Sequence, residues 1–148
     1  MKKFFESRWF ILALRVVLGG LFLYAGASKI GNPLAFADSI ATFKLLPPQL
    51  LNVVALSLPP FEILLGILLV TGLQARPASL GITVLAIVFG IALGQALARG
   101  LQVDCGCFGS GQPSTLKTWG SFARAGLFCL AGVWLYFQNL KRRSPENP

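Results

Sequence analysis

Two cysteines, Cys105 and Cys107, stand one residue apart in the stretch VDCGCFG, in a chain that has three cysteines and no histidine. A disulfide needs its Cα atoms within about 4.4–6.8 Å, so a bridge between such close neighbours requires a bent backbone. Gly106 between them permits the bend, because glycine adopts positive φ without steric cost. A ring this small is strained, and strained disulfides exchange readily. Cys105 and Cys107 are therefore candidate catalytic thiols of a redox protein.

Two other roles are possible for this pair, a structural cross-link and a metal site. A structural cross-link is disfavoured, because the stabilisation a disulfide provides grows with the length of chain that it closes. Two thiolates can hold a soft ion such as Cu(I). Zinc needs about four ligands, and Asp104 is the one further candidate nearby. Asp104 itself either disfavours the neighbouring thiolate or is an ordinary solvated acid, and both interpretations stay open.

The composition indicates a membrane protein. Of 148 residues 55% are hydrophobic and 12% are charged, about half the charged share of soluble domains. A membrane-spanning helix needs about 20 mainly apolar residues. The fold class expected is an all-α integral membrane four-helix bundle, 1–148 being one domain. Its four spans are predicted at roughly 9–30, 51–73, 78–98 and 119–137.

The basic residues predict the orientation, because Lys and Arg accumulate in cytoplasmic segments. One side receives Lys2, Lys3, Arg8, Arg76, Lys141, Arg142 and Arg143, and the other receives Lys29, Lys44, Arg99 and Lys117. Both termini are therefore predicted in the cytoplasm and the loop 99–118 in the periplasm of a bacterium, where disulfides persist. The basic residues that give the net charge of +8 cluster at segment ends. They do not form the continuous basic stripe that is typical of nucleic-acid-binding proteins. Cleavage of the first span as a signal peptide is disfavoured by Arg15 within it.

The spans carry a few charged residues, which usually face a partner or a cavity. Arg15, Gly19, Gly26 and Lys29 share one helical face, whose glycines allow close approach of another helix. Arg15 lies about 9 Å and Glu62 about 16 Å from the cytoplasmic ends of their spans. We therefore predict an Arg15–Glu62 ion pair, either structural or forming a polar pocket for a quinone head group or a proton path.

The last span adds two further candidates. Arg124 lies near its outer end, where it either supports a thiolate of the cysteine loop or reaches outward to the membrane surface. Cys129 lies about 15 Å below Trp119. It is interpreted as a small buried hydrophobic residue.

Three stretches carry a resemblance to a known family. ALRVVLGGLFLYAGASKIGNP and LPPFEILLGILLVTGL resemble the helix signatures of the DoxX-like superfamily, and DCGCFG is similar to the MauE branch. The resemblance covers nearly the whole chain. It implies a bacterial inner-membrane protein that assists maturation of the disulfide-rich small subunit of a periplasmic methylamine dehydrogenase, alongside a thioredoxin-like partner, with Cys105 and Cys107 as the redox pair.

The leading hypothesis is a membrane thiol–disulfide oxidoreductase that exchanges with a periplasmic thioredoxin-like protein or a disulfide-containing client. By functional analogy, a membrane quinone is a candidate cofactor that takes or supplies the electrons. Two alternatives stay open. One is a non-enzymatic scaffold subunit of a larger membrane complex, and the other is a copper-handling membrane protein that uses the thiols.

Overall fold

The computed structural model of the protein describes residues 7–103 and 115–143, and within these ranges it contains helices and no strand. The helices are α2 (Arg8–Gly31), α3 (Pro33–Thr42), α4 (Pro48–Thr71), α5 (Ala75–Ala98) and α6 (Thr115–Arg143). All except α3 are long and apolar enough to cross a membrane. A helix of 24 residues rises about 36 Å, more than the hydrocarbon thickness of a bilayer. The predicted all-α membrane four-helix bundle is confirmed.

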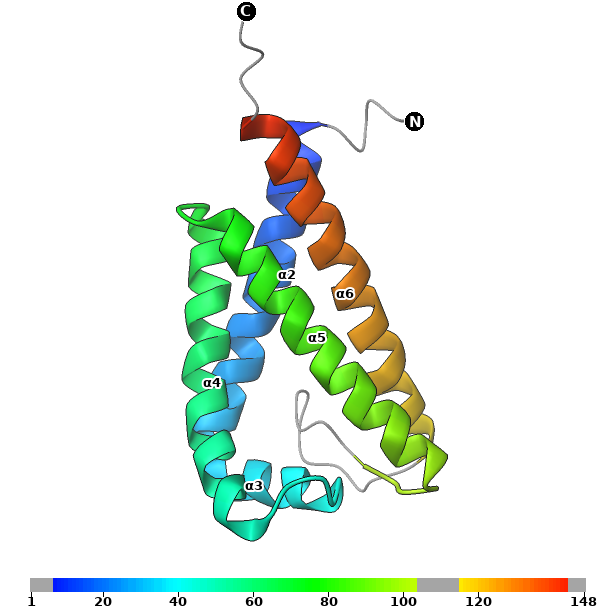
Figure 1. Cartoon of the computed structure of the whole chain (residues 1–148). Helices are drawn as coiled ribbons and strands as arrows, with labels where there is room; N and C mark the ends of the chain where they lie inside the picture. The colour runs from blue at the N-terminus through cyan, green and yellow to red at the C-terminus, as the bar shows by residue number, and fades with distance from the viewer. Residues whose placement is uncertain (1–6, 104–114, 144–148) are drawn as a thin grey trace, which may run out of the picture.

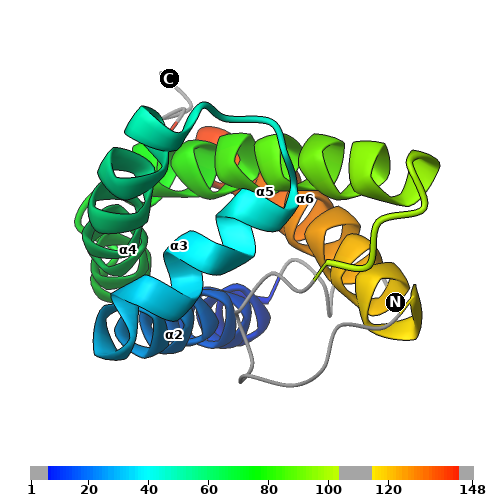
Figure 2. The same ribbon diagram turned by 90° about the horizontal axis from the view of Figure 1, so that it is seen from below.

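The four long helices form two antiparallel pairs, α2 with α4 and α5 with α6 (Figure 1). The first turn of α2 and the last turn of α6 lie at the same end of the molecule, where the two pairs converge. A buried core joins all four helices there, with Leu18 of α2, Leu69 of α4, Ile82 of α5 and Leu135 of α6. At the opposite end the pairs diverge, and α3 lies across the space between them (Figure 2).

The contact between α2 and α4 is made through glycines. A Cβ atom on Gly19 would lie 2.9 Å from the carbonyl oxygen of Gly66, and one on Gly26 would lie 2.9 Å from that of Pro59. Both distances are too short for a real side chain, so the two backbones touch at these points. Helix pairs in membranes associate closely where small residues face one another. The predicted role of the small residues on the first span is in agreement with this geometry.

Pro59 and Pro60 lie inside α4 and do not divide it, because the helix runs unbroken from Pro48 to Thr71. Each proline lacks the N–H that would donate to the carbonyl four residues earlier. Two consecutive prolines could therefore kink this span or divide it into two pieces. The structure shows one helix, whose end is marked by Gly72 in the left-handed conformation, with φ of 75°.

Two features of the fold go beyond the sequence prediction. Helix α3 was not predicted, although Asn32-Pro33 is a start signal: the Asn32 side chain accepts a hydrogen bond from Ala35 N at 3.4 Å, and proline is favoured in the first turn. Helix α6 extends past both ends of the apolar run 119–137. Backbone hydrogen bonding does not end where hydrophobicity ends, and basic residues favour the last turn of a helix.

Candidate functional site

The predicted redox residues Cys105 and Cys107, with Asp104 and Gly106, lie outside the described residues. Their assignment as catalytic and supporting residues stays a prediction. The chain on either side of the segment is described, up to Val103 and again from the first turn of α6. Those flanking residues define the part of the bundle to which the segment is attached.

Val103 is fixed to α6 by its backbone. Its N–H donates to Thr118 Oγ1 at 3.2 Å, and the Thr118 hydroxyl donates back to the Val103 carbonyl oxygen at 2.9 Å. Both residues are buried, and the Val103 side chain packs with Phe43, Leu93 and Ala125. The residue that stands two positions before Cys105 is therefore held between α5 and α6, beside the end of α3.

Replacing Thr118 by valine removes this clamp without changing the shape of the side chain. The N–H and carbonyl groups of Val103 would lose a partner in a buried site, which costs about 1–3 kcal/mol of the free energy of unfolding. We expect the Val103 amide to lose its protection in hydrogen–deuterium exchange. Thr118→Ser keeps the hydroxyl and serves as the matched control. Equal protection of Val103 in both variants would show that the clamp does not hold this segment.

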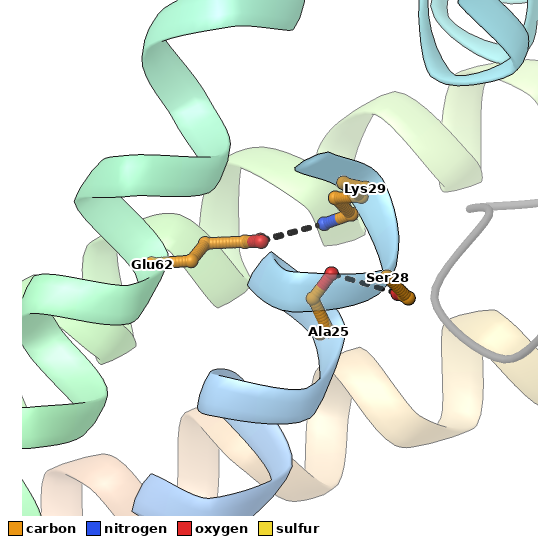
Figure 3. Close-up of polar contacts among 4 residues, drawn as sticks. All are labelled: Ala25, Ser28, Lys29 and Glu62. Atoms are coloured by element: carbon orange, nitrogen blue, oxygen red, sulfur yellow. Dashed lines mark hydrogen bonds and ion pairs between the residues drawn. The ribbon is translucent and has the colours of Figure 1, made fainter. Parts of the chain in front are cut away.

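A buried ion pair joins Lys29 of α2 to Glu62 of α4 (Figure 3). Lys29 Nζ donates to both carboxylate oxygens of Glu62, at 2.7 and 2.8 Å. Lys29 is 2% exposed and Glu62 is 4% exposed. Hydrogen bonds between ionised partners are short and strong, and a charge this deep in a membrane protein requires such a partner.

Aromatic rings complete the surroundings of the Lys29 ammonium. Its Nζ lies 4.8 Å from the ring centroid of Phe36 on α3 and 5.4 Å from that of Phe89 on α5. Cations are attracted to the negative face of an aromatic ring. Lys29 thus connects α2 with α3, α4 and α5 at the end where the helix pairs diverge.

The predicted Arg15–Glu62 ion pair is wrong, because Glu62 pairs with Lys29. Arg15 instead donates from Nε and Nη2 to the carbonyl oxygen of Leu69, both at 3.1 Å. Gly19 faces Gly66, and the antiparallel register then places Arg15, one turn earlier in α2, at the last turn of α4. The guanidinium lies against Gly72, where a Cβ atom would overlap it. Arg15 therefore supplies donors to the carboxyl end of α4.

The structure places the remaining candidates in α6 and finds one feature that the sequence did not reveal. Cys129 is half-buried and its thiol is not in a disulfide. Arg124 is exposed and lies on the wall of a pocket. This pocket is formed by residues of α2, α4, α5 and α6, and Glu62 contributes to its wall as well. Glu62 was expected in a polar pocket with Arg15; the pocket in the structure contains Glu62 and not Arg15, because its residues come from four helices whose register the sequence does not show.

The part of the chain that the structure describes contains no group of three or more cysteine, aspartate or glutamate side chains placed to hold a metal ion. The pocket and the Lys29–Glu62 ion pair are neighbours, because Glu62 belongs to both. Both lie at the end of the molecule to which the segment 104–114 is attached, since Leu93 and Ala125 line the pocket and also pack against Val103.

Comparisons with known proteins give a consistent result. The family model described as "Methylamine utilisation protein MauE" matches residues 7–138. The curated "Methylamine utilization protein MauE" of Paracoccus denitrificans is 37% identical over 112 residues, covering 75% of this chain and 60% of that protein. Its counterpart in Paracoccus versutus is 36% identical over 113 residues, covering 76% and 60%. That of Methylorubrum extorquens is 32% identical over 105 residues, covering 70% and 56%.

The chain thus spans between 56% and 60% of the length of these relatives. No solved structure matches it at a significant level.

Proposed function

The chain belongs to the MauE family of methylamine utilisation proteins and is a multi-pass membrane protein, and we propose that it is a membrane-embedded thiol–disulfide exchange protein. Cys105 and Cys107 are its redox pair, and its partner is a periplasmic thioredoxin-like protein or a disulfide-containing client. The family link suggests, as client, the disulfide-rich small subunit of a methylamine dehydrogenase. The observation that carries the proposal is the pair of cysteines one glycine apart, two residues beyond the buried anchor Val103.

The proposed orientation places both termini in the cytoplasm and the cysteine loop in the periplasm of a bacterial inner membrane. The excess of Lys and Arg at the chain ends and at Arg76 supports it. The first turn of α2, Arg76 and the last turn of α6 lie at one end of the bundle, and Arg76 Nε donates to the carbonyl oxygen of Asn139 at 3.1 Å. Val103 lies at the other end, so the loop that follows it is expected in the oxidising compartment.

The exchange reaction has two steps. A thiolate of the pair attacks a sulfur of the partner's disulfide, forming a mixed disulfide and releasing one partner thiolate, which takes up a proton. The second cysteine of the pair then attacks the mixed disulfide, which forms the Cys105–Cys107 bond and releases the partner as a dithiol. Two electrons pass from the pair to the partner, and the reverse sequence oxidises the partner instead. Gly106 permits the backbone bend that the small disulfide ring needs. A strained disulfide of this kind exchanges readily.

Single cysteine variants test the proposal. We expect Cys105→Ser and Cys107→Ser each to reduce disulfide exchange with a thioredoxin-like protein to the background rate. The variant that lacks the second, resolving cysteine is expected to accumulate the mixed disulfide, visible as a reducible cross-linked band and identified by mass spectrometry. Cys129→Ser is the matched control, since this half-buried thiol lies within α6 and is not part of the pair. Unchanged exchange in the two loop variants would contradict the proposal.

A further inference from the structure

A second pocket lies at the end of the molecule where the helix pairs converge. It is open, has a volume of about 600 Å³, and is lined by residues 72–77 and by Asn139 of α6. Residues 72–74 join α4 to α5, which are both long and apolar enough to cross a membrane, and Asn139 lies near the end of the apolar part of α6, Thr118–Lys141. The pocket therefore lies where three helices reach the membrane surface, at the level of the lipid phosphate groups.

Arg76 brings a positive charge and unused hydrogen-bond donors to this pocket. Its Nε and Nη2 donate to the carbonyl oxygen of Asn139, both at 3.1 Å, and Nη2 also donates to that of Leu140 at 3.3 Å. Among the described residues, Nη1 has no hydrogen-bond partner and no carboxylate pairs with the guanidinium. Guanidinium groups bind phosphate oxygens in proteins through N–H groups of this kind.

Other donors and another positive charge surround the same pocket. The side-chain nitrogen of Asn139 is buried and has no partner in the part of the chain that the structure describes, which is costly for a donor. The Arg15 guanidinium lies against Gly72, on the pocket wall. The first turn of α5 also belongs to the lining and contains no acidic residue, and the first N–H groups of a helix attract anions. These groups together favour an anionic occupant.

Apolar side chains beside the donors favour a phospholipid over a soluble phosphate. Leu73, in the lining, is 82% exposed. Leu80 is 49% exposed and follows Arg76 by one turn of α5, on the same face and deeper in the membrane. A phospholipid whose phosphate meets Arg76 has acyl chains to lay against both leucines. Its net charge also matters, because the ammonium of a zwitterionic headgroup is repelled by Arg76 and Arg15.

From this arrangement we propose that the pocket binds the phosphate of an anionic phospholipid. Arg76 Nη1 and the Asn139 amide donate to the phosphate oxygens, and Leu73 and Leu80 contact the acyl chains. A basic pocket between membrane helices is a recognised type of lipid headgroup site. The bound lipid contacts both the turn before α5 and the end of α6, so it stabilises the folded protein. The site uses no residue of the cysteine segment and is independent of the proposed thiol–disulfide function.

The proposal is tested by measuring lipid binding to the full-length protein in detergent, by native mass spectrometry, with phosphatidylglycerol as the probe. We expect one phosphatidylglycerol to bind more tightly than phosphatidylethanolamine with the same acyl chains. Asn139→Asp and Gln74→Glu each add a carboxylate to the lining and should weaken phosphatidylglycerol binding about tenfold or more, a loss of over 1.4 kcal/mol. Gln138→Glu is the matched control: it makes the same charge change at the next position of α6, outside the lining, and should leave the affinity unchanged.

Both pocket variants are expected to fold. The new carboxylate of Asn139→Asp lies on the residue that Arg76 already contacts, and Gln74 is exposed in the turn. Unfolding in SDS checks this for all three variants. If only one pocket variant folds, the comparison of that variant with Gln138→Glu still decides the test.

Three results would overturn the lipid site. The first is equal weakening in the pocket variants and in Gln138→Glu, which would show an effect of overall charge. The second is equal affinity for phosphatidylglycerol and phosphatidylethanolamine. The third is displacement of phosphatidylglycerol by glycerol phosphate, which carries the phosphate without acyl chains, since a soluble phosphate ester is then the occupant.

Discussion

Lys29→Met is expected to lower the free energy of unfolding by about 3–5 kcal/mol, because it leaves the Glu62 carboxylate buried without its partner. Both oxygens of Glu62 accept hydrogen bonds from Lys29, and the carboxylate is 4% exposed. Methionine has a length similar to that of lysine, so the variant changes the charge with little change in packing. Unfolding of the protein in mixed micelles by increasing SDS, followed by tryptophan fluorescence, measures the effect.

The double variant Lys29→Met/Glu62→Leu tests whether the stability lost in Lys29→Met comes from the unpaired Glu62 carboxylate. Replacing a buried pair by apolar residues is often neutral or stabilising, because neither charge then has to leave water. We expect the double variant to recover most of the stability that the single variant loses. A double variant as unstable as Lys29→Met would show that the cost does not come from an unpaired Glu62. In that case the contacts of the lysine with Phe36 and Phe89 would be the more important ones.

Gly19→Ala is the second prediction with a large effect. The new Cβ atom would lie 2.9 Å from the Gly66 carbonyl oxygen and still closer to a methyl group of Val70. The Val70 side chain can rotate, but the carbonyl belongs to the backbone of α4, so α2 and α4 must move apart. Overpacking of this kind costs about 1–3 kcal/mol. The separation would also spread to the Lys29–Glu62 contact, which joins the same two helices.

Gly20→Ala is the matched control, since nothing lies within 4 Å of a Cβ atom at the neighbouring position. Alanine favours a helix over glycine by up to about 1 kcal/mol, so this variant is expected to be neutral or slightly stabilising. The two substitutions are chemically identical and differ in which face of α2 they occupy. Similar destabilisation in both, in the same SDS titration, would contradict the close α2–α4 contact.

Much of the fold was predictable from the sequence because a bilayer imposes simple rules. A segment that crosses it must be long, apolar and internally hydrogen-bonded, and these properties can be counted along the chain. The four long helices accordingly lie on the four predicted apolar stretches. Helix α3 was missed because it is short, although Asn32 and Pro33 provided a recognisable start.

The partner of Glu62 was predicted wrongly because depth was counted from the ends of the spans. That count assumes that helices begin and end at the same level. The Gly26 contact with Pro59 shows instead that α4 begins well beyond the end of α2, next to α3. Lys29 lies about one turn past the level of Glu62, and side chains in a helix lean toward its amino end. Its long chain therefore reaches Glu62, whereas Arg15 is level with Gly72.

The number of spans, the charged residues within them and the two neighbouring cysteines could be found without a structure, because they follow from residue type and spacing along one chain. Three features needed the packed helices: Lys29 is the partner of Glu62, Arg15 binds the end of α4, and residues from four helices line one pocket. The physical reason is helix register. How far one helix is shifted along another depends on where glycines let backbones touch, and a single span does not contain that information.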